Sequence, residues 1–414
     1  MNMTTNLTRQ TMLKQAQELP LEDLDVSNWY LMENDAIWPY FERLRKEDPI
    51  HYHAESRYGP YWSITRFDDI KDVDQNHKVF SSHGTIGIED MASDFETPMF
   101  IAMDQPKHDI QRKAVSPVVG PKNLAGFESV IRERVGKILD SLPVGETFNW
   151  VDRVSIELTT QMLATLFAFP FEERRKLTHW SDVATIPGMS FEERRNEMLE
   201  CLAYFTELWH QRKNDPEPGF DLISMLINGE GTKDMINKPL EYLGNIILLI
   251  VGGNDTTRNS ISGGVLALNQ FPAEYDKLRA DHSLIPNMVA EIIRWQTPLA
   301  YMRRTALEDI DFKGKQIKKG DKVVMWYASG NRDEEKFEDA NSLIIDRPNA
   351  RNHISFGFGI HRCMGNRLAE MQLRVLWEEI MQRFDHVEVV GEPVRVRSNF
   401  VRGYSELPVR LHKK

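Results

Sequence analysis

The stretch spanning residues 238–270 constrains the fold more than any other part of this chain. Its apolar residues recur at helical spacing, and Pro272 follows it directly as a residue that ends helices. A single helix over this stretch would be roughly 50 Å long at the usual rise per residue. The sequence therefore predicts one long central helix.

Shorter patterns elsewhere predict more helices than strands. Helical spacing is found in residues 35–46, 67–75, 106–115, 127–142, 155–167, 171–183, 191–213, 287–296 and 364–382. Strand patterns are found in residues 50–54 and 61–65, within 302–326 and within 387–411. The chain has no internal repeat and no linker rich in Pro, Gly or Ser. We expect one domain over 1–414, mainly α with a minor β region, in which 1–34 form an N-terminal extension ahead of a 35–414 core.

Composition excludes several classes of protein. Hydrophobic residues make up 41% and charged residues 27% of the 414, which is typical of a globular protein. The net charge of −11 argues against nucleic acid and anionic membrane as partners. Two cysteines form no disulfide framework. The longest fully apolar run covers only residues 246–251, and the first twenty residues lack the apolar core of a signal peptide. We therefore expect no membrane anchor and a cytoplasmic location.

One of the two cysteines lies in a setting suited to metal ligation. Cys363 follows a glycine-broken loop that contains Phe356 and His361, and it stands just ahead of the helix predicted for 364–382. A helix N-terminus offers unpaired N–H groups and a positive dipole, so we expect Cys363 to favour the thiolate over the thiol. The alternative is a buried, inert cysteine. A zinc site is not favoured, because His361 and Cys363 have no second ligand pair nearby in the sequence.

The long helix contains a second motif, the sequence from Gly252 to Thr257. Glycines in mid-helix cost about 1 kcal/mol each relative to Ala, which is acceptable where a large flat group must lie against the backbone. Thr256 can bond to the Gly252 carbonyl one turn back and loosen the helix there. Asp255 can then carry protons, and Thr256 can donate a hydrogen bond to bound oxygen. The alternative is a helix crossing eased by small residues, with Asp255 on a solvated face. A Cys–His nucleophile pair stays conceivable but leaves this motif unexplained.

The loop pattern Phe-x-x-Gly-x-x-x-Cys-x-Gly resembles the haem-binding loop of the cytochromes P-450, in which a cysteine thiolate ligates haem iron. The resemblance extends along nearly the whole chain. It implies haem b bound by Cys363, with Phe356 and Gly252 beside the haem. His108, Arg112, Arg304 and His361 stand at positions from which the family binds the two haem propionates. The resemblance also implies a monooxygenase that uses dioxygen, Asp255 and Thr256, as opposed to a haem-thiolate sensor without catalysis.

A further motif is expected to serve folding. Glu291 and Arg294 are three residues apart on one predicted helix face and can form an ion pair. In the cytochromes P-450 this Glu-x-x-Arg pair is completed by an arginine ahead of the cysteine loop, and Arg347 stands at the matching place. We therefore assign these three residues to stability and not to catalysis.

Within the family, the motifs around Thr256 and Cys363 are most similar to the bacterial hydroxylases that oxidise alkanes and fatty acids at the terminal carbon. That resemblance implies medium-chain linear substrates, with a steroid side chain or a terpene as the alternative. It also implies a narrow apolar channel, because only steric confinement directs oxidation to the stronger C–H bonds of a methyl group. The expected lining is Ile86, Phe100, Ile186, Met189, Leu248, Val251, Leu299, Met302 and Phe400. The loop over residues 81–100 is either a lid over this channel or a segment folded back on the core.

Electrons must come from elsewhere, because the chain carries no flavin-binding or iron–sulfur motif. The resemblance implies NAD(P)H as the source, with a ferredoxin reductase and a ferredoxin as carriers. Arg362, Arg367 and Arg374 flank the cysteine and are candidate contacts for an acidic ferredoxin.

Overall fold

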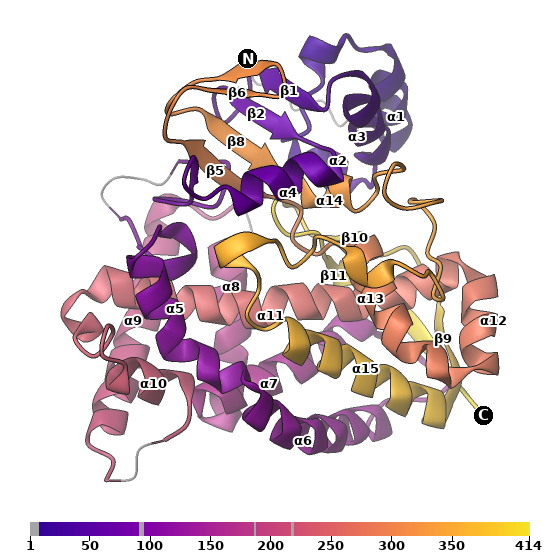
Figure 1. Ribbon diagram of the computed structural model, residues 1–414. Helices are drawn as coiled ribbons and strands as arrows, with labels where there is room; N and C mark the ends of the chain where they lie inside the picture. The colour runs from indigo at the N-terminus through magenta and orange to yellow at the C-terminus, as the bar shows by residue number, and fades with distance from the viewer. Residues whose placement is uncertain (1–7, 91–94, 186–187, 217–218) are drawn as a thin grey trace.

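The computed structural model describes residues 8–90, 95–185, 188–216 and 219–414, and helices dominate it (Figure 1). The helices are α1 (Arg9–Glu18), α2 (Trp29–Glu33), α3 (Trp38–Glu47), α4 (Phe67–Gln75), α5 (Lys107–Val115), α6 (Pro121–Asp140), α7 (Glu157–Phe167), α8 (Arg175–Thr185), α9 (Phe191–Lys213), α10 (Leu222–Asn228), α11 (Pro239–Gln270), α12 (Pro272–Ala280), α13 (Ile285–Gln296), α14 (Tyr327–Gly330) and α15 (Asn366–Arg383).

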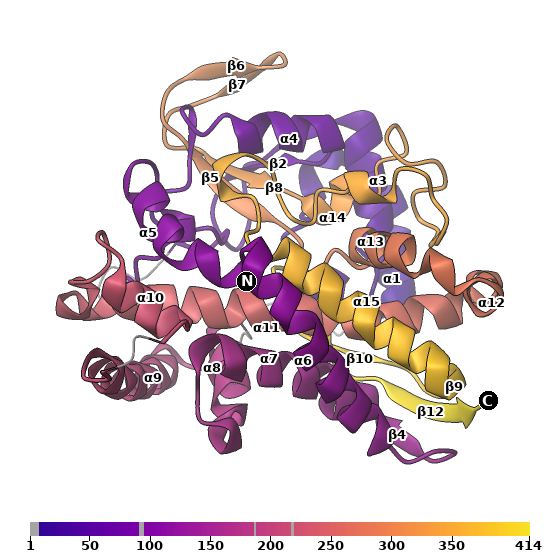
Figure 2. The ribbon, with the colours of Figure 1, turned by 60° about the horizontal axis from the view of Figure 1, so that its bottom comes forward.

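Strands form a minor region, mostly to one side of the helices. They are β1 (Ile50–His53), β2 (Tyr61–Ile64), β3 (Phe80–Ser81), β4 (Thr147–Asn149), β5 (Met302–Ala306), β6 (Ile310–Phe312), β7 (Lys315–Ile317), β8 (Lys322–Met325), β9 (Phe384–Val389), β10 (Val394–Arg395), β11 (Tyr404–Glu406) and β12 (Pro408–Lys413). The largest sheet has the order β1-β2-β8-β5-β3, in which β2 and β8 are parallel and the other pairs antiparallel. The β6–β7 hairpin projects from its edge (Figure 2).

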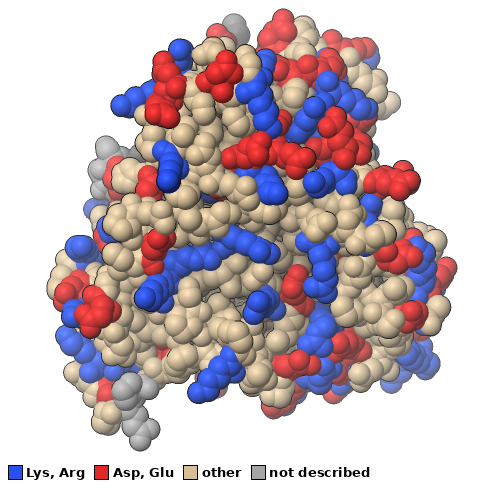
Figure 3. Space-filling model, viewed as in Figure 1, with Lys and Arg blue, Asp and Glu red and all other residues tan. Residues whose placement is uncertain are grey.

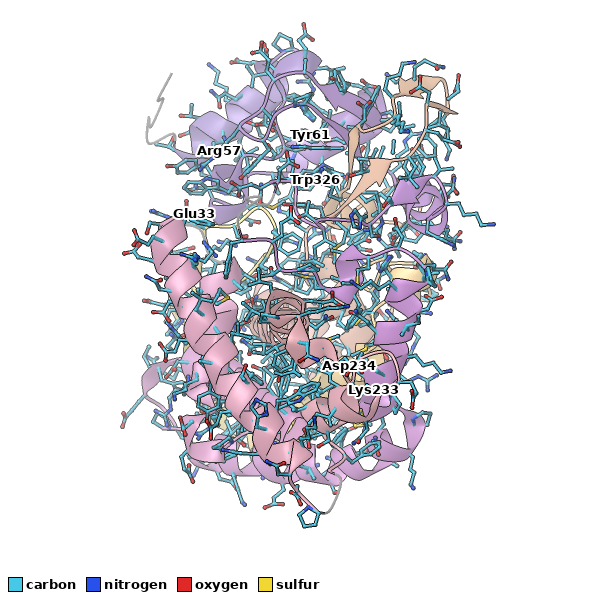
Figure 4. The ribbon with its side chains drawn as sticks, turned by 90° about the vertical axis from the view of Figure 1, so that its left-hand side faces the viewer. Glu33, Arg57, Tyr61, Lys233, Asp234 and Trp326 are labelled. Carbon is cyan, nitrogen blue, oxygen red and sulfur yellow. The ribbon has the colours of Figure 1, made fainter. Side chains whose placement is uncertain are left out.

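The long helix α11 crosses the middle of the molecule, and α7, α8, α9, α13 and α15 all pack against it (Figures 1 and 2). Figure 4, in which α11 is seen end-on, shows side chains around it on all sides. Gly264 permits the close crossing with α13, because a Cβ atom there would lie 2.9 Å from the Ile292 Cδ1 atom. The predicted central helix is confirmed, and Pro239 and Pro272 frame it as the first residues of α11 and α12.

The fold class is as expected, mainly α with a minor β region, but several elements differ from the sequence prediction. The helices α4 and α9 have the predicted bounds. A wide helical turn, Val151–Ile156, precedes α7 and replaces the start expected at residue 155. The sequence patterns did not predict α1, α2, α10 or α12. These helices are short or mostly polar, so their helical period is weak.

The described part of the stretch expected as an N-terminal extension packs onto the rest of the chain. Met12 and Ala16 of α1 are buried against α3, and the cluster that they join also contains Tyr61 and Trp326. Figure 4 shows these two aromatic side chains close together in the upper part of the molecule. The boundary expected at residue 34 therefore does not separate two packing units.

A buried ion-pair network joins α13 to the segment that leads into the cysteine loop. Glu291 accepts from Arg294 Nε and Nη2, both at 2.7 Å, and from Arg347 Nε at 3.0 Å. Arg294 also donates to the carbonyl oxygens of Asn331, Ala340 and Ser342. The Glu291 and Arg294 side chains are 0% exposed. This burial is consistent with the assignment of the network to stability and not to catalysis.

None of the helices in the described residues combines the length and the apolar character that crossing a bilayer requires.

Candidate functional site

The cysteine loop is held against α4 before it enters α15. Gly359 has a φ of +66°, and a Cβ atom there would lie 2.7 Å from the Asp74 backbone carbonyl oxygen. The Asp74 carboxylate accepts a hydrogen bond from Phe358 N at 2.8 Å. The loop then returns, so that Cys363 N donates to the Phe356 carbonyl oxygen at 2.8 Å. Only glycine fits position 359, which explains the glycine-broken sequence of this loop.

The Cys363 thiol opens onto a cavity, whereas the other cysteine, Cys201, is buried in α9. Burial raises the pKa of the Cys363 thiol above its usual value, although the N–H of Gly365 and the charge of Arg112 act in the opposite direction. Desolvation opposes the effect of the helix N-terminus here, and a positive metal ion at the sulfur would favour the thiolate that the sequence predicts.

The second motif borders the same cavity from α11. Gly252 and Thr256 both line it, and Thr256 Oγ1 donates to the Gly252 carbonyl oxygen at 3.2 Å, as the spacing predicted. A Cβ atom at Gly252 would meet nothing within 4 Å. The glycine therefore leaves open space beside the helix backbone instead of easing contact with another helix.

Asp255 lies at the cavity margin and is 0% exposed, so the alternative of a solvated face is wrong. Its carboxylate accepts from Ser181 Oγ and Thr185 Oγ1 of α8, each at 3.0 Å, and pairs with Arg258 Nη2 at 2.9 Å. Arg258 also pairs with Asp182 at 3.0 Å. Burial raises the pKa of Asp182, opposed by the charge of Arg258 and reinforced by that of Asp255. A cluster of charges thus links α11 to α8.

Polar side chains from three distant segments converge on the cysteine side of the cavity. Arg112 from α5, Arg304 from β5 and His361 from the loop all line it. The His108 ring lies 4.2 Å from the His361 ring, although His108 itself does not line the cavity. Arg304 Nη2 pairs with Asp74 at 2.7 Å. Burial and the charge of Arg304 lower the pKa of His361 to about 2, so this histidine is neutral.

The rest of the cavity lining is mostly apolar. Of the residues expected along a substrate channel, those that line it are Ile86, Phe100, Leu248, Val251, Leu299, Met302 and Phe400. The described part of the 81–100 loop is both folded back and part of the lining, because Ile88 is buried while Ile86 faces the cavity.

Two of the expected lining residues are not placed in this cavity. Met189 is 37% exposed and lies in a separate surface hollow with Glu193 and Asn196, so its assignment is wrong. It stands just before Ser190, which caps α9, and the chain there runs along the surface. Ile186 lies outside the described residues.

Comparison with known proteins gives the family. The sequence model of cytochrome P450 matches residues 145–403. Linalool 8-monooxygenase from Pseudomonas putida is 34% identical over 413 residues, covering 95% of this chain and 100% of that protein. The chain belongs to the cytochrome P450 family. A methyl-branched lipid omega-hydroxylase from Mycobacterium tuberculosis is 32% identical, with 95% of each chain covered. The solved structure of cytochrome P450-153 from Novosphingobium aromaticivorans is 46% identical, with a TM-score of 0.88 over 94% of this chain and 99% of that one.

This cytochrome P450 is accordingly a monooxygenase, an oxidoreductase that incorporates oxygen from dioxygen. Its cofactor is haem with a cysteine thiolate on iron, and redox partners supply its electrons. The site fits that group. His361 Nδ1 and Nε2 and His108 Nε2 are buried without a hydrogen-bond partner among the described residues. Gly252 and Gly365 leave open space where a flat ring system can lie.

Sequence analysis missed a further part of the lining of this P450. The residues concerned are Ile101, Val118, Val119, Met162, Leu166, Leu222, Tyr327 and Val401. All are apolar or aromatic and stand in helices or at loop ends, where they look like ordinary core residues. Ile101 and Val401 carried a signal, because each directly follows an expected lining residue, Phe100 or Phe400.

Proposed function

We propose that this P450 hydroxylates medium-chain linear alkanes or fatty acids at the terminal carbon. The observation that carries the proposal is the continuous apolar lining beside Cys363, formed by side chains from α11, β5 and three loops. A wall of Leu, Ile, Val, Met and Phe binds hydrocarbon without orienting it by hydrogen bonds. Shape alone must then decide which carbon reaches the cysteine side.

We assign Cys363 as the iron ligand, with Phe356 and the Gly252 backbone in contact with the haem faces. Arg112, Arg304, His108 and His361 are the partners of the haem propionates, and the unpaired ring nitrogens of the two histidines support this assignment. Bound haem supplies the activation of dioxygen, with two electrons and two protons consumed for each oxygen atom inserted.

The polar groups of α11 manage protons in this proposal. Thr256 lies at the cavity wall with its hydroxyl one turn from Gly252, where it can orient a water or dioxygen molecule by a hydrogen bond. Asp255 is buried beside it and is connected through Arg258 to Asp182, whose side chain is 36% exposed. Because a guanidinium does not release its proton, Arg258 holds the Asp255 carboxylate in place, and Asp255 itself takes up protons from water and passes them to the cavity while the apolar lining excludes bulk water.

Terminal oxidation requires that the chain enters end-on. Met302 begins the β5 strand, Leu299 stands three residues before it, and both line the cavity together with Arg304 of the same strand. Phe400 reaches the same region from the C-terminal tail and packs against Tyr301 with ring centroids 5.2 Å apart. Rigid side chains at this place limit sideways movement of a chain near the cysteine. The name of the omega-hydroxylase relative supports oxidation at a chain end.

We further propose an acidic ferredoxin, reduced from NAD(P)H by a ferredoxin reductase, as the electron donor. Lys and Arg side chains gather across the middle of the face that carries α5 and α15 (Figure 3). Arg362 and Arg367 are exposed next to the cysteine loop. Arg374, the third expected contact, is engaged by Glu128 and Glu378 at 2.8 Å each and contributes less free charge. Positive charge here steers an acidic partner despite the overall negative charge.

A second candidate substrate is a branched or bulkier hydrocarbon such as a terpene or a steroid side chain. It is favoured by the relatives named for linalool and for methyl-branched lipids. In a narrow channel, linear octane binds more tightly than a branched alkane of the same carbon number. In a wide one the order is reversed.

The decisive experiment combines product analysis with one substitution. Purified protein with a surrogate ferredoxin and reductase should convert octane mainly to 1-octanol. Leu299→Ala should raise the share of 2-octanol more than it lowers total turnover, because removing the side chain lets the methylene group approach. Leu307→Ala is the control, since Leu307 is 45% exposed outside the cavity. Mainly subterminal product from the unaltered protein would overturn the terminal assignment.

A further inference from the structure

The carboxylate of Asp255 has two oxygens with different surroundings. Oδ1 accepts from Ser181 Oγ at 3.0 Å and Asn254 Nδ2 at 3.1 Å, and it pairs with Arg258 Nη2 at 2.9 Å. Oδ2 accepts from Thr185 Oγ1 at 3.0 Å, and this is its one side-chain donor among the described residues. Oδ1 is therefore saturated with donors, whereas Oδ2 has room to hold a proton.

The single hydroxyl proton of Thr185 has two acceptors within reach. Thr185 Oγ1 lies 3.0 Å from Asp255 Oδ2 and 2.9 Å from the backbone carbonyl oxygen of Ser181, one turn earlier in α8. A threonine hydroxyl has one donor proton and two acceptor lone pairs, so it cannot donate to both oxygens at once. It must point to one or the other.

This geometry matches the two protonation states of the neighbouring acid. When Asp255 is a carboxylate, the Thr185 hydroxyl donates to Oδ2. When Oδ2 carries a proton, that proton is donated to Thr185 Oγ1, and the Thr185 hydroxyl turns to the Ser181 carbonyl oxygen. Both arrangements leave every polar atom of the pair with a partner, and only a rotation about the Cβ–Oγ bond separates them.

We propose that Thr185 is a positioning residue that holds Asp255 Oδ2 in place in both protonation states and so sustains proton delivery to the cavity. Each proton delivered is first taken up on Oδ2 from water and then released from it to the cavity, and the Thr185 hydroxyl reverses its direction each time. The inference rests on the proposed proton-carrying role of Asp255 and names the residue on α8 on which that role depends.

The other charged groups facing this carboxylate come from the same two helices. Arg258 of α11 pairs with Oδ1, and Asp182 of α8 shares that guanidinium at 3.0 Å. Ser181 is less suited to the exchange, because its oxygen approaches the saturated Oδ1. The α8 helix packs closely on α11 along this contact, with Ser181 and Trp180 buried (Figure 2). The direction-reversing hydroxyl is therefore specific to position 185.

The test compares Thr185→Val, which keeps the shape and removes the hydroxyl, with Thr185→Ser, which keeps the hydroxyl. The control is Thr178→Val on the same helix, because Thr178 Oγ1 lies 3.3 Å from Thr160 Oγ1 of α7 and does not contact Asp255. The readout is the product formed per NAD(P)H consumed with a surrogate ferredoxin and reductase. Thr185→Val should lower the rate of product formation about tenfold, the effect of one lost hydrogen bond to a charged group, and peroxide should replace the product. Thr185→Ser and Thr178→Val should stay near the unaltered protein.

A second readout does not depend on turnover. If Thr185 bonds to Asp255 in solution, Asp255→Ala should speed amide hydrogen exchange in the last turn of α8, and it should leave exchange in α9 unchanged.

The coupling, defined as the product formed per NAD(P)H consumed, has outcomes that would overturn each proposal separately. If Thr185→Val kept the coupling of the unaltered protein while Asp255→Asn lost it, the inference would be overturned and the role of Asp255 would stay intact. Unchanged coupling in Asp255→Asn would overturn the role of Asp255 itself. If Thr185→Ser also formed less product per NAD(P)H consumed, as Thr185→Val should, the hydroxyl alone would not sustain proton delivery and the inference would be overturned.

Discussion

Glu291→Gln should destabilise the protein by about 3–5 kcal/mol without changing the chemistry of the molecules that stay folded. Glu291 is 0% exposed and is the shared partner of Arg294 at 2.7 Å and Arg347 at 3.0 Å. Glutamine keeps the shape but removes the charge, which leaves two guanidinium groups buried without a counter-ion. A loss of this size is a large part of the 5–15 kcal/mol by which a typical domain is stable.

An exposed ion pair of equal length provides the matched control. Arg43 and Glu47 also approach to 2.7 Å, but their side chains are 22% and 44% exposed. Glu47→Gln should therefore cost only about 0.3–0.5 kcal/mol, because water solvates the arginine that is left. The two variants share the substitution and the shortest Arg–Glu distance, and they differ in burial and in the second arginine that Glu291 binds.

The assay is urea unfolding of the haem-loaded protein followed by far-ultraviolet circular dichroism, with turnover of octane measured per folded haem. The unfolding midpoint of Glu291→Gln should fall far below that of Glu47→Gln, while its turnover per folded haem stays close to that of the unaltered protein. Equal midpoints for the two variants would refute the burial argument. Normal stability of Glu291→Gln together with lost turnover would show that Glu291 takes part in the reaction and not in stabilising the fold.

Three further predictions concern the ligand, the electron donor and acid stability. Cys363→Ala should abolish the thiolate-type absorption band of the reduced carbon monoxide complex, and Cys201→Ala should keep it. The reverse result would show that Cys363 is not the iron ligand. Electron transfer from an acidic ferredoxin should slow as salt shortens the Debye length from about 10 Å at 0.1 M to about 3 Å at 1 M, and Arg367→Glu should slow it at low salt. Electron-transfer rates that do not change with salt concentration would exclude electrostatic binding of the ferredoxin. Burial lowers the pKa of His53 to about 3, below the usual 6.5, so its contribution to stability is complete above pH 6.5 and is lost as the pH falls toward 3. His53→Gln should weaken the dependence of urea unfolding on pH in that window, and an unchanged dependence would place the acid-sensitive group elsewhere.

Helix ends and turns that depend on the backbone preferences of single proline and glycine residues were predictable from the sequence. Pro239 and Pro272 set the limits of α11, and glycine at position 359 was needed for the turn ahead of Cys363. The bond from Thr256 to the Gly252 carbonyl also followed from spacing alone, because residues four apart in a helix share one face. Such features depend only on residues that are near one another in the sequence, so they can be predicted from it.

Tertiary structure decided everything that depends on burial or on partners far away in the sequence. The pKa of the Cys363 thiol is raised although its place before a helix predicted the opposite, because the surrounding protein removes water from it. Met189 and Leu299 looked equally suitable as lining, yet only Leu299 faces the cavity. Apolar character indicates burial but not which of several buried surfaces a side chain joins.

The partners of Asp255 show the same division. The position of Asp255 beside Thr256 and its role as a proton carrier could both be predicted from the order of residues in one helix. The sequence gave no indication that Ser181 and Thr185 of α8 bind the two carboxylate oxygens, because those hydroxyls come from residues 74 and 70 positions earlier. Only the packing of α8 across α11 brings them within 3.0 Å, and packing is a property of the whole chain.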